Sequence, residues 1–276
     1  MSMASMNKIE VKNVFKIYGA RAEDALSMIR QKKTKDQVLA ETGCVVGVND
    51  LSLSIGNGEI FVIMGLSGSG KSTLVRHFNR LIDPTSGAIL VNGEDIMQYN
   101  MDALRQFRRH KISMVFQSFG LLPHHTVLDN VAYGLKVRGE SKAMCAERAL
   151  HWIAAVGLKG YENKYPHQLS GGMRQRVGLA RALAADTDII LMDEAFSALD
   201  PLIRAEMQDQ LLELQKSLQK TIVFITHDLD EAVRIGNHIA ILKDGRLIQV
   251  GTPKEILYSP ADEYVDRFVQ RRVVTL

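Results

Sequence analysis

A glycine-rich segment, GLSGSGKST, at residues 65–73 restricts the possible folds of this chain more than any other pattern. An apolar run at 60–64 has the pattern of a buried strand, and a helical pattern follows over 73–81. A glycine-rich loop between a strand and a helix is the setting of the pattern G-x-x-x-x-G-K-[ST]. The residues at its defining positions are Gly65, Gly70, Lys71 and Ser72.

The residue types of this segment suit the phosphates of a nucleotide. Glycines let the backbone wrap closely around phosphate, while amide N–H groups and a helix N-terminus supply positive potential. We expect Lys71 to reach the β and γ phosphates and Ser72 to ligate Mg²⁺. The alternative is a Gly/Ser-rich turn before a helix, which the flanking strand and helix disfavour.

A second chemical signal is the run IILMDE at residues 189–194. A buried strand there delivers Asp193 and Glu194 to the carboxyl edge of a sheet, where α/β proteins bind ligands. Asp193 is predicted to hold Mg²⁺ through its shell, and Glu194 to polarise the attacking water as a general base. Taken alone, the run fits a strand that ends at a solvated surface.

A third signal is the sequence LSGGM at residues 169–173. Ser170 is placed to cap a helix whose first turn holds Gly171 and Gly172, which leaves amide donors exposed as a second anion site. Taken alone, this is an ordinary capped helix with a flexible start.

The rest of the chain predicts short apolar strands that alternate with helices, and therefore a mostly parallel, buried sheet. Strands are expected over 8–18, 49–64, 112–116, 189–192, 221–226 and 238–242. A helical lobe is expected over 127–158. Asp244-Gly245 between two apolar runs predicts a hairpin turn.

Two further helical regions carry clear end signals. Over 21–41 a short amphipathic helix is expected, followed by a second helix that starts at a capping box of Thr34 and Gln37. Asp200 is placed to cap a long helix with Pro201 at its first position.

Composition excludes several classes of protein. No uncharged apolar run in the 276 residues approaches the roughly 18 that a membrane helix needs, and no secretory signal is visible. Domains that bind nucleic acid usually carry a larger and more clustered positive charge than the net +3 of this chain, so no nucleic-acid partner is expected. Cys44 and Cys145 have no metal-type spacing, and we expect free thiols in a reducing cytosol.

Together these segments resemble the ATP-binding cassette family over nearly the whole chain. Residues 65–72 resemble its Walker A loop, 189–194 its Walker B strand and 169–173 its signature. The resemblance implies one nucleotide-binding domain over 1–276. Its fold class would be α/β: a P-loop NTPase (RecA-like) core with an antiparallel β subdomain and a helical signature subdomain over about 118–185.

Three more positions match the family in order: Gln117 the Q-loop, Ser197-Ala198-Leu199-Asp200 the D-loop, and His227 the switch histidine. Tyr18 is placed like the aromatic residue that stacks on adenine. Taken alone, Gln117 fits a glutamine in a surface loop, His227 a histidine at the end of a strand, and Tyr18 a packed aromatic residue. The pair His124-His125 has no matching metal ligands and fits a plain loop.

The resemblance implies ATP and Mg²⁺ as cofactors and assigns a role to each site residue. Phosphate binding falls to Gly65, Ser67, Gly68, Ser69, Gly70, Lys71, Ser72 and Thr73, and Mg²⁺ to Ser72, Gln117 and Asp193. Catalysis falls to Glu194, His227 and Gln117, the D-loop aspartate is Asp200, and Ser170, Gly171 and Gly172 act on ATP held by a second subunit.

Segments 59–73 and 192–204 and an insertion at 21–46 are similar to the ATPase subunits of glycine betaine/proline importers, a subfamily that includes choline, carnitine and histidine/proline uptake systems. The sequence stops at Leu276 without the CBS modules of the osmoregulatory branch, so it resembles the short branch. A histidine/proline uptake system is the alternative. The insertion either contacts a permease or covers a sheet edge.

The partners implied are a second copy in an ATP-bound sandwich, two membrane permease subunits that dock near Gln117 and residues 118–130, and a periplasmic or lipid-anchored solute-binding protein. The implied location is peripheral, on the cytoplasmic face of the inner membrane. The rival classes are a cassette ATPase acting on DNA or ribosomes, and a scaffold that binds ATP without hydrolysing it.

Overall fold

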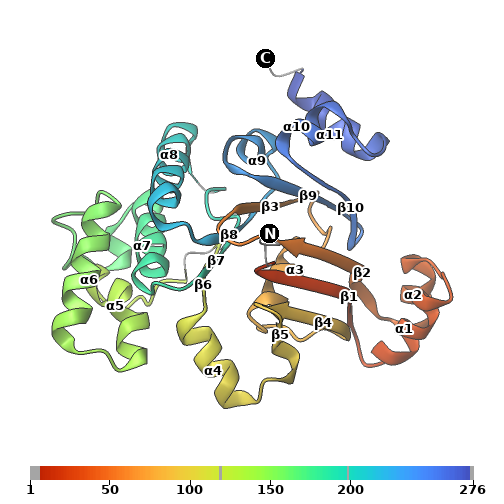
Figure 1. The fold of residues 1–276 in the computed structure, drawn as a ribbon, viewed down its shortest axis with the longest axis horizontal. Helices are drawn as coiled ribbons and strands as arrows, with labels where there is room; N and C mark the ends of the chain where they lie inside the picture. The colour runs from red at the N-terminus through yellow and green to blue at the C-terminus, as the bar shows by residue number, and fades with distance from the viewer. Residues whose placement is uncertain (1–6, 118–119, 198, 274–276) are drawn as a thin grey trace, which may run out of the picture. The chain divides into compact units, whose positions relative to one another are not determined.

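The computed structural model describes residues 7–117, 120–197 and 199–273. The chain divides into two compact units, one formed by residues 1–100 and 227–276 and the other by residues 101–226 (Figure 1). No helix among the described residues is both long enough and apolar enough to cross a membrane. Ser118 and Ala198, which belong to the predicted permease socket and D-loop, lie outside the described residues.

The first unit holds an antiparallel sheet and part of a parallel one. The antiparallel sheet has the order β2-β1-β4-β5, and β3 runs parallel to β9, which forms a hairpin with β10. Its strands are β1 (Ile9–Tyr18), β2 (Val45–Ile55), β3 (Ile60–Met64), β4 (Ser86–Val91), β5 (Glu94–Asp95), β9 (His238–Lys243) and β10 (Arg246–Gly251). Its helices are α1 (Ala22–Arg30), α2 (Lys35–Thr42), α3 (Lys71–Phe78), η1 (Ile96–Gln98), α9 (Leu229–Ile235), α10 (Pro253–Tyr258) and α11 (Glu263–Val273).

The insertion folds as two helices, α1 and α2, which lie beside the ends of β1 and β2 (Figure 1). The predicted capping box of α2 is confirmed, since Thr34 Oγ1 accepts from the Gln37 amide at 3.3 Å and the Gln37 side chain accepts from the Thr34 amide at 2.9 Å. Apolar side chains of both helices pack on β1 and β2 in one buried cluster: Phe15, Ile17, Ala25, Leu26, Ile29, Val38, Cys44 and Val46. The two helices of the insertion therefore bury apolar side chains of β1 and β2, and both alternatives for its role, a permease contact or cover of a sheet edge, stay predictions.

The second unit has a parallel sheet of order β8-β7-β6. Every residue of β7 and β8 is buried, as a parallel sheet covered on both faces requires. The strands are β6 (Ile112–Val115), β7 (Ile189–Asp193) and β8 (Thr221–Thr226). The helices are α4 (Met101–His110), α5 (Val127–Arg138), α6 (Lys142–Ala155), η2 (Pro166–Gln168), α7 (Gly171–Ala184) and α8 (Pro201–Leu218).

Several predicted element boundaries were wrong. The strand expected over 49–64 is two strands, because a turn with Gly58 at φ 74° separates β2 from β3. The helix expected over 73–81 begins at Lys71 and ends at Phe78, after which Arg80 has φ 50°. The predicted hairpin turn is confirmed, since Asp244 and Gly245 have φ of 51° and 75° and join β9 to β10.

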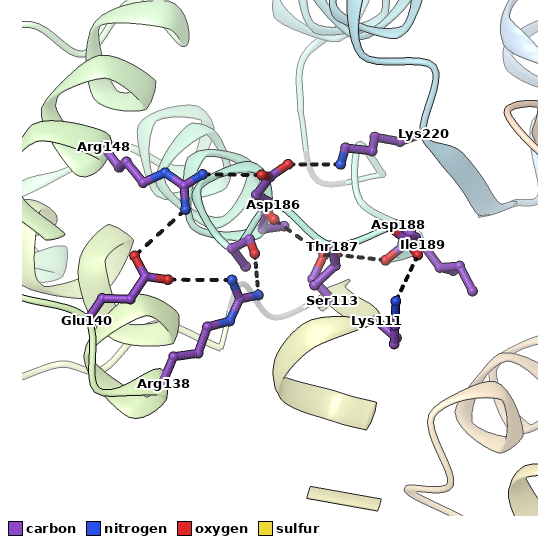
Figure 2. A network of polar contacts seen from close by, with 12 residues as sticks. Lys111, Ser113, Arg138, Glu140, Arg148, Asp186, Thr187, Asp188, Ile189 and Lys220 are labelled. Carbon is purple, nitrogen blue, oxygen red and sulfur yellow. Dashed lines mark hydrogen bonds and ion pairs between the residues drawn. The ribbon is translucent and has the colours of Figure 1, made fainter. Parts of the chain in front are cut away.

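A polar network in the second unit fixes the turn between α7 and β7 (Figure 2). Asp186, at φ 47°, accepts from Lys220 Nζ at 2.8 Å and from Arg148 Nη2 at 3.2 Å. Partial burial acts to raise the pKa of Asp186, but the hydrogen bonds and charges of Lys220 and Arg148 prevail and hold that pKa below its usual value. Arg138 donates to the Ala185 carbonyl from the other side. The network ties α6 and the end of α8 to the turn that orients α7 and β7.

Candidate nucleotide-binding site

The segment 65–73 forms the loop between β3 and the start of α3 in the first unit. Its glycines are required by close contacts. A Cβ on Gly65 would lie 2.3 Å from the Leu242 carbonyl oxygen, and a Cβ on Gly70 would lie 2.4 Å from that of Gly47. Gly70, at φ 97°, is the N-cap of α3 and has no side chain to cap the helix. The first amides of α3 are therefore left without a side-chain cap.

Lys71 lies within this loop and is 5% exposed. Its ammonium donates to the Gly65 carbonyl at 2.8 Å and to the Leu66 carbonyl at 3.0 Å. The hydroxyl of Ser69 is buried with no hydrogen-bond partner among the described residues. A buried cation and an unsatisfied hydroxyl beside uncapped amides are the chemistry that a phosphate group satisfies, so these residues fit the phosphates of a nucleotide.

Tyr18 lies at the end of β1 beside the helix that carries this loop. Its hydroxyl is 3.3 Å from the Thr73 hydroxyl, and Lys16 Nζ lies 5.1 Å from the centre of its ring. The residue is 38% exposed. An exposed ring next to a phosphate loop can accept a base by stacking, and this role of Tyr18 stays a prediction.

In the second unit, β7 ends at the two acidic residues. Asp193 is buried at the last position of the strand, and Glu194 follows it with φ 47°, a conformation that a non-glycine residue rarely adopts. Gln117, after β6, donates from Nε2 to Glu194 Oε2 at 3.0 Å. The structure therefore brings together two of the predicted catalytic residues, 77 positions apart in the chain.

The predicted signature begins α7. Ser170 is the N-cap, and its hydroxyl accepts from the Met173 amide at 3.3 Å, as expected for a capped helix. An open pocket of about 400 Å³ lies over this helix start. It is lined by Gly157, Leu158, Tyr161, Ser170, Gly171, Gly172, Met173, Arg176, Leu199, Asp200 and Ile203.

Asp200 caps α8 as predicted, with Oδ1 accepting from the Ile203 amide at 3.1 Å. It also lines the signature pocket. His227 follows the last residue of β8 and is exposed. The next residue, Asp228, caps α9 by accepting from the amides of Asp230 and Glu231. The parts assigned to Asp200 and His227 in ATP hydrolysis stay predictions.

Sequence reasoning missed the backbone that supports the phosphate loop. The Gly245 amide donates to the Ser69 carbonyl at 3.0 Å, and the Asn49 amide donates to the Gly245 carbonyl at 2.8 Å. The Asp-Gly turn was predicted, but no pattern linked it to residues 65–73. Tyr161 in the signature pocket was also missed, because a lone tyrosine in a loop carries no signal.

A profile of the ABC transporter family matches residues 48–197 of this chain. The chain therefore belongs to the ABC transporter family. It is 57% identical over 95% of its length to the glycine betaine transport ATP-binding protein OpuAA of Bacillus subtilis. It is 59% identical over 95% of its length to the glycine betaine/proline betaine transport system ATP-binding protein ProV of Escherichia coli. The chain spans about two thirds of the length of these relatives, 63% of OpuAA and 65% of ProV.

The family extends to other solutes. The trimethylamine N-oxide transport system ATP-binding protein TmoW of Ruegeria pomeroyi is 52% identical over 95% of this chain and 77% of its own length. Among solved structures, the dimeric bacterial ABC transporter cassette MJ0796 matches with a TM-score of 0.76 and 34% identity, over 89% of this chain and 98% of that one. This likeness confirms the predicted fold class, a P-loop NTPase core with an antiparallel β subdomain and a helical part.

Proposed function

We propose that this chain is the ATP-hydrolysing subunit of a bacterial ABC importer for glycine betaine and related quaternary amines. The observation that carries the proposal is the identity of 57–59%, over 95–96% of the chain, to ATP-binding proteins of glycine betaine transport systems. The hydrogen bond between Gln117 and Glu194 at 3.0 Å supports hydrolysis, because a base needs a held orientation.

The residues divide the chemistry of hydrolysis between them. The amides of 65–73 and the ammonium of Lys71 bind the β and γ phosphates, and Tyr18 stacks on adenine. Mg²⁺, held by Ser72, Gln117 and Asp193, would offset the negative charge of the phosphates. Glu194 accepts a proton from the water that attacks the γ-phosphorus, ADP departs, and His227 orients the γ-phosphate.

The transport cycle needs a second copy of the chain. In our proposal Ser170, Gly171 and Gly172 bind the γ-phosphate of ATP held by the partner subunit, with Asp200 at the same interface. The pocket over the start of α7 is open and holds four residues of the signature, so an anion has access to its amides. The dimeric form of the related cassette supports this arrangement.

The other partners follow from the class of importer. Two permease subunits in the inner membrane would dock near Gln117, on the cytoplasmic face of that membrane. They would receive the motion by which the dimer closes on ATP. A periplasmic or lipid-anchored binding protein would select the solute. The solutes of related ATP-binding proteins favour betaines over histidine, since they are glycine betaine, carnitine, choline and trimethylamine N-oxide.

Hydrolysis is tested with the purified chain and the variant Glu194→Gln. We expect turnover to fall about 100-fold or more, because the amide cannot accept the proton, while ATP binding is retained. A matched control is Glu213→Gln, at an exposed position on α8. A Glu194→Gln variant that turns over at the native rate would contradict the assignment of the base.

The solute is tested by uptake in cells that lack this chain, with labelled glycine betaine, choline, proline and histidine at low and high osmolarity. We expect the loss of betaine or choline uptake and its rescue by the native chain but not by Lys71→Ala. Loss of histidine uptake alone would replace the proposed solute class with that of a nutrient importer.

A further inference from the structure

The C-terminal helix α11 reaches the phosphate loop, although no motif of the sequence links them. A cavity of about 130 Å³ in the first unit is lined by Leu66 of the loop and by Tyr264, Arg267 and Phe268 of α11. The sequence places about 200 residues between these segments. Only the fold therefore brings the helix beside the loop.

Tyr264 makes a polar contact from α11 to another element of the first unit. Its hydroxyl donates to the Leu242 carbonyl at 3.3 Å. The pKa of Tyr264 is raised, mainly because burial disfavours the phenolate, and a hydrogen bond from the Leu66 backbone opposes that shift. The hydroxyl therefore contacts β9, and the side chain lies at the same cavity as Leu66 of the phosphate loop.

The Leu242 carbonyl is the atom that limits the first glycine of the loop. A Cβ on Gly65 would lie 2.3 Å from this oxygen, so loop and carbonyl are in close contact. The carbonyl therefore limits where the loop leaves β3, and the same oxygen accepts the hydrogen bond of the tyrosine hydroxyl. A shift of this oxygen would move the amides that precede Lys71.

The ring of Tyr264 is itself held in place. Lys243 Nζ lies 4.8 Å from its centre, and Phe268 packs edge-on with ring centres 5.1 Å apart. The next residue, Val265, is fully buried, and α11 packs against α9 and α10. α9 begins two residues after His227. Helix α11 therefore contacts the helix that follows the histidine, in addition to Leu66 of the phosphate loop.

We propose that Tyr264 is a positioning residue for the phosphate loop: its hydroxyl holds the Leu242 carbonyl, and thereby the backbone at Gly65 and Leu66, in the arrangement that binds nucleotide phosphates. The inference rests on the proposed function, since ATP is the ligand positioned. It gives α11 a role in nucleotide affinity, although none of the sequence motifs described above includes a residue of this helix.

The test compares Tyr264→Phe with native protein by direct binding of ATP, ADP and adenosine. The variant keeps the ring between Lys243 and Phe268 and removes only the hydroxyl. Loss of one neutral hydrogen bond that positions the loop predicts a Kd for ATP and ADP about fivefold higher. Adenosine, which has no phosphate, is expected to bind equally to both proteins.

Two further readouts separate positioning from stability. Hydrogen exchange of the amides at 65–69 is expected to quicken in Tyr264→Phe, and KM for ATP to rise more than kcat changes. The control is Tyr258→Phe on α10, at a residue that is 77% exposed. A lower Tm with unchanged nucleotide affinity and exchange would make Tyr264 a structural residue and overturn the inference. Native protein that binds no ATP would overturn the proposed function and the inference together.

Discussion

Two helices in this chain begin with glycine-rich sequence, and they differ in their N-terminal caps and in the space around their glycines. α3 starts at Gly70, which offers no capping side chain, and its loop is crowded by backbone. A Cβ on Gly65 or on Gly70 would lie 2.3 Å or 2.4 Å, respectively, from a carbonyl oxygen. α7 starts at Ser170, which caps it, and a Cβ on Gly171 would have no atom within 4 Å.

The two helix starts show two different reasons why a position is occupied by glycine. In the phosphate loop, glycine is required by the fold of the subunit, because the backbone adopts positive φ against neighbouring carbonyls. At the signature, Gly171 has no such requirement. Its small size leaves the start of α7 open, as a helix end that receives a ligand from outside the subunit would need.

Lys71→Ala is expected to have the largest effect on activity. Removing the ammonium that lies in the phosphate loop takes away a preorganised cation, so turnover should fall about 100-fold or more, with weaker ATP binding. Steady-state hydrolysis and equilibrium binding measure the two effects. Lys254→Ala, at an exposed position on α10, is the control and should behave as the native chain.

Gly70→Ala should destabilise the first unit by about 2–3 kcal/mol and weaken ATP binding, because a methyl group meets the Gly47 carbonyl at 2.4 Å in a left-handed conformation. Urea unfolding measures the loss. Gly43→Ala is the matched control, since it has φ 69° and no atom within 4 Å and so carries the conformational cost alone. Equal losses in both variants would show that the close contact contributes nothing.

Ser170→Ala removes the cap of α7 and should lower the free energy of unfolding by about 1 kcal/mol. ATP binding to the isolated subunit should be unchanged, while hydrolysis falls because the hydroxyl is lost from the proposed dimer interface. Ser141→Ala, which removes the same type of cap from α6, is expected to cost similar stability and leave hydrolysis intact. Equal hydrolysis in the two variants would contradict a role for Ser170 beyond capping.

Gly171→Ala should leave stability unchanged or raise it by about 0.5 kcal/mol, since alanine favours helix and the site has space. Hydrolysis should nevertheless fall, with normal ATP affinity of the single subunit. Thermal unfolding with and without ATP, beside a hydrolysis assay, measures both. A variant that is destabilised as much as Gly70→Ala would break the contrast between the two helix starts.

Acid should loosen α3 before α7. His77 on α3 is fully buried, and burial lowers its pKa, opposed by its hydrogen bond to the Ile82 carbonyl at 2.7 Å. The unfolded chain therefore binds the proton first, so stability is complete above about pH 6.5 and falls as the pH drops toward the lowered pKa. Hydrogen exchange at pH 5 and 7.5, corrected for intrinsic rates, should show faster opening of α3. The same pH dependence in His77→Gln would contradict this cause.

The chain also shows which inferences a pattern supports. The capping box at Thr34, the caps at Ser170 and Asp200, and the Asp244-Gly245 turn were predicted correctly, because each depends on residues within a few positions of one another. The predicted boundaries of β2, β3 and α3 were wrong. Their ends depend on turns in which a single residue, such as Arg80, adopts positive φ, and tertiary packing decides where such turns form.

The family, the fold class and the candidate site residues could be inferred from the order of the residues, because phosphate loops and helix caps are local features with fixed spacing. The tertiary structure alone decided which distant atoms meet: Gln117 with Glu194, the Gly47 carbonyl with Gly70, and Tyr264 with Leu242. These contacts arise when strands far apart in the chain share a sheet, and no short pattern of residues encodes that registration.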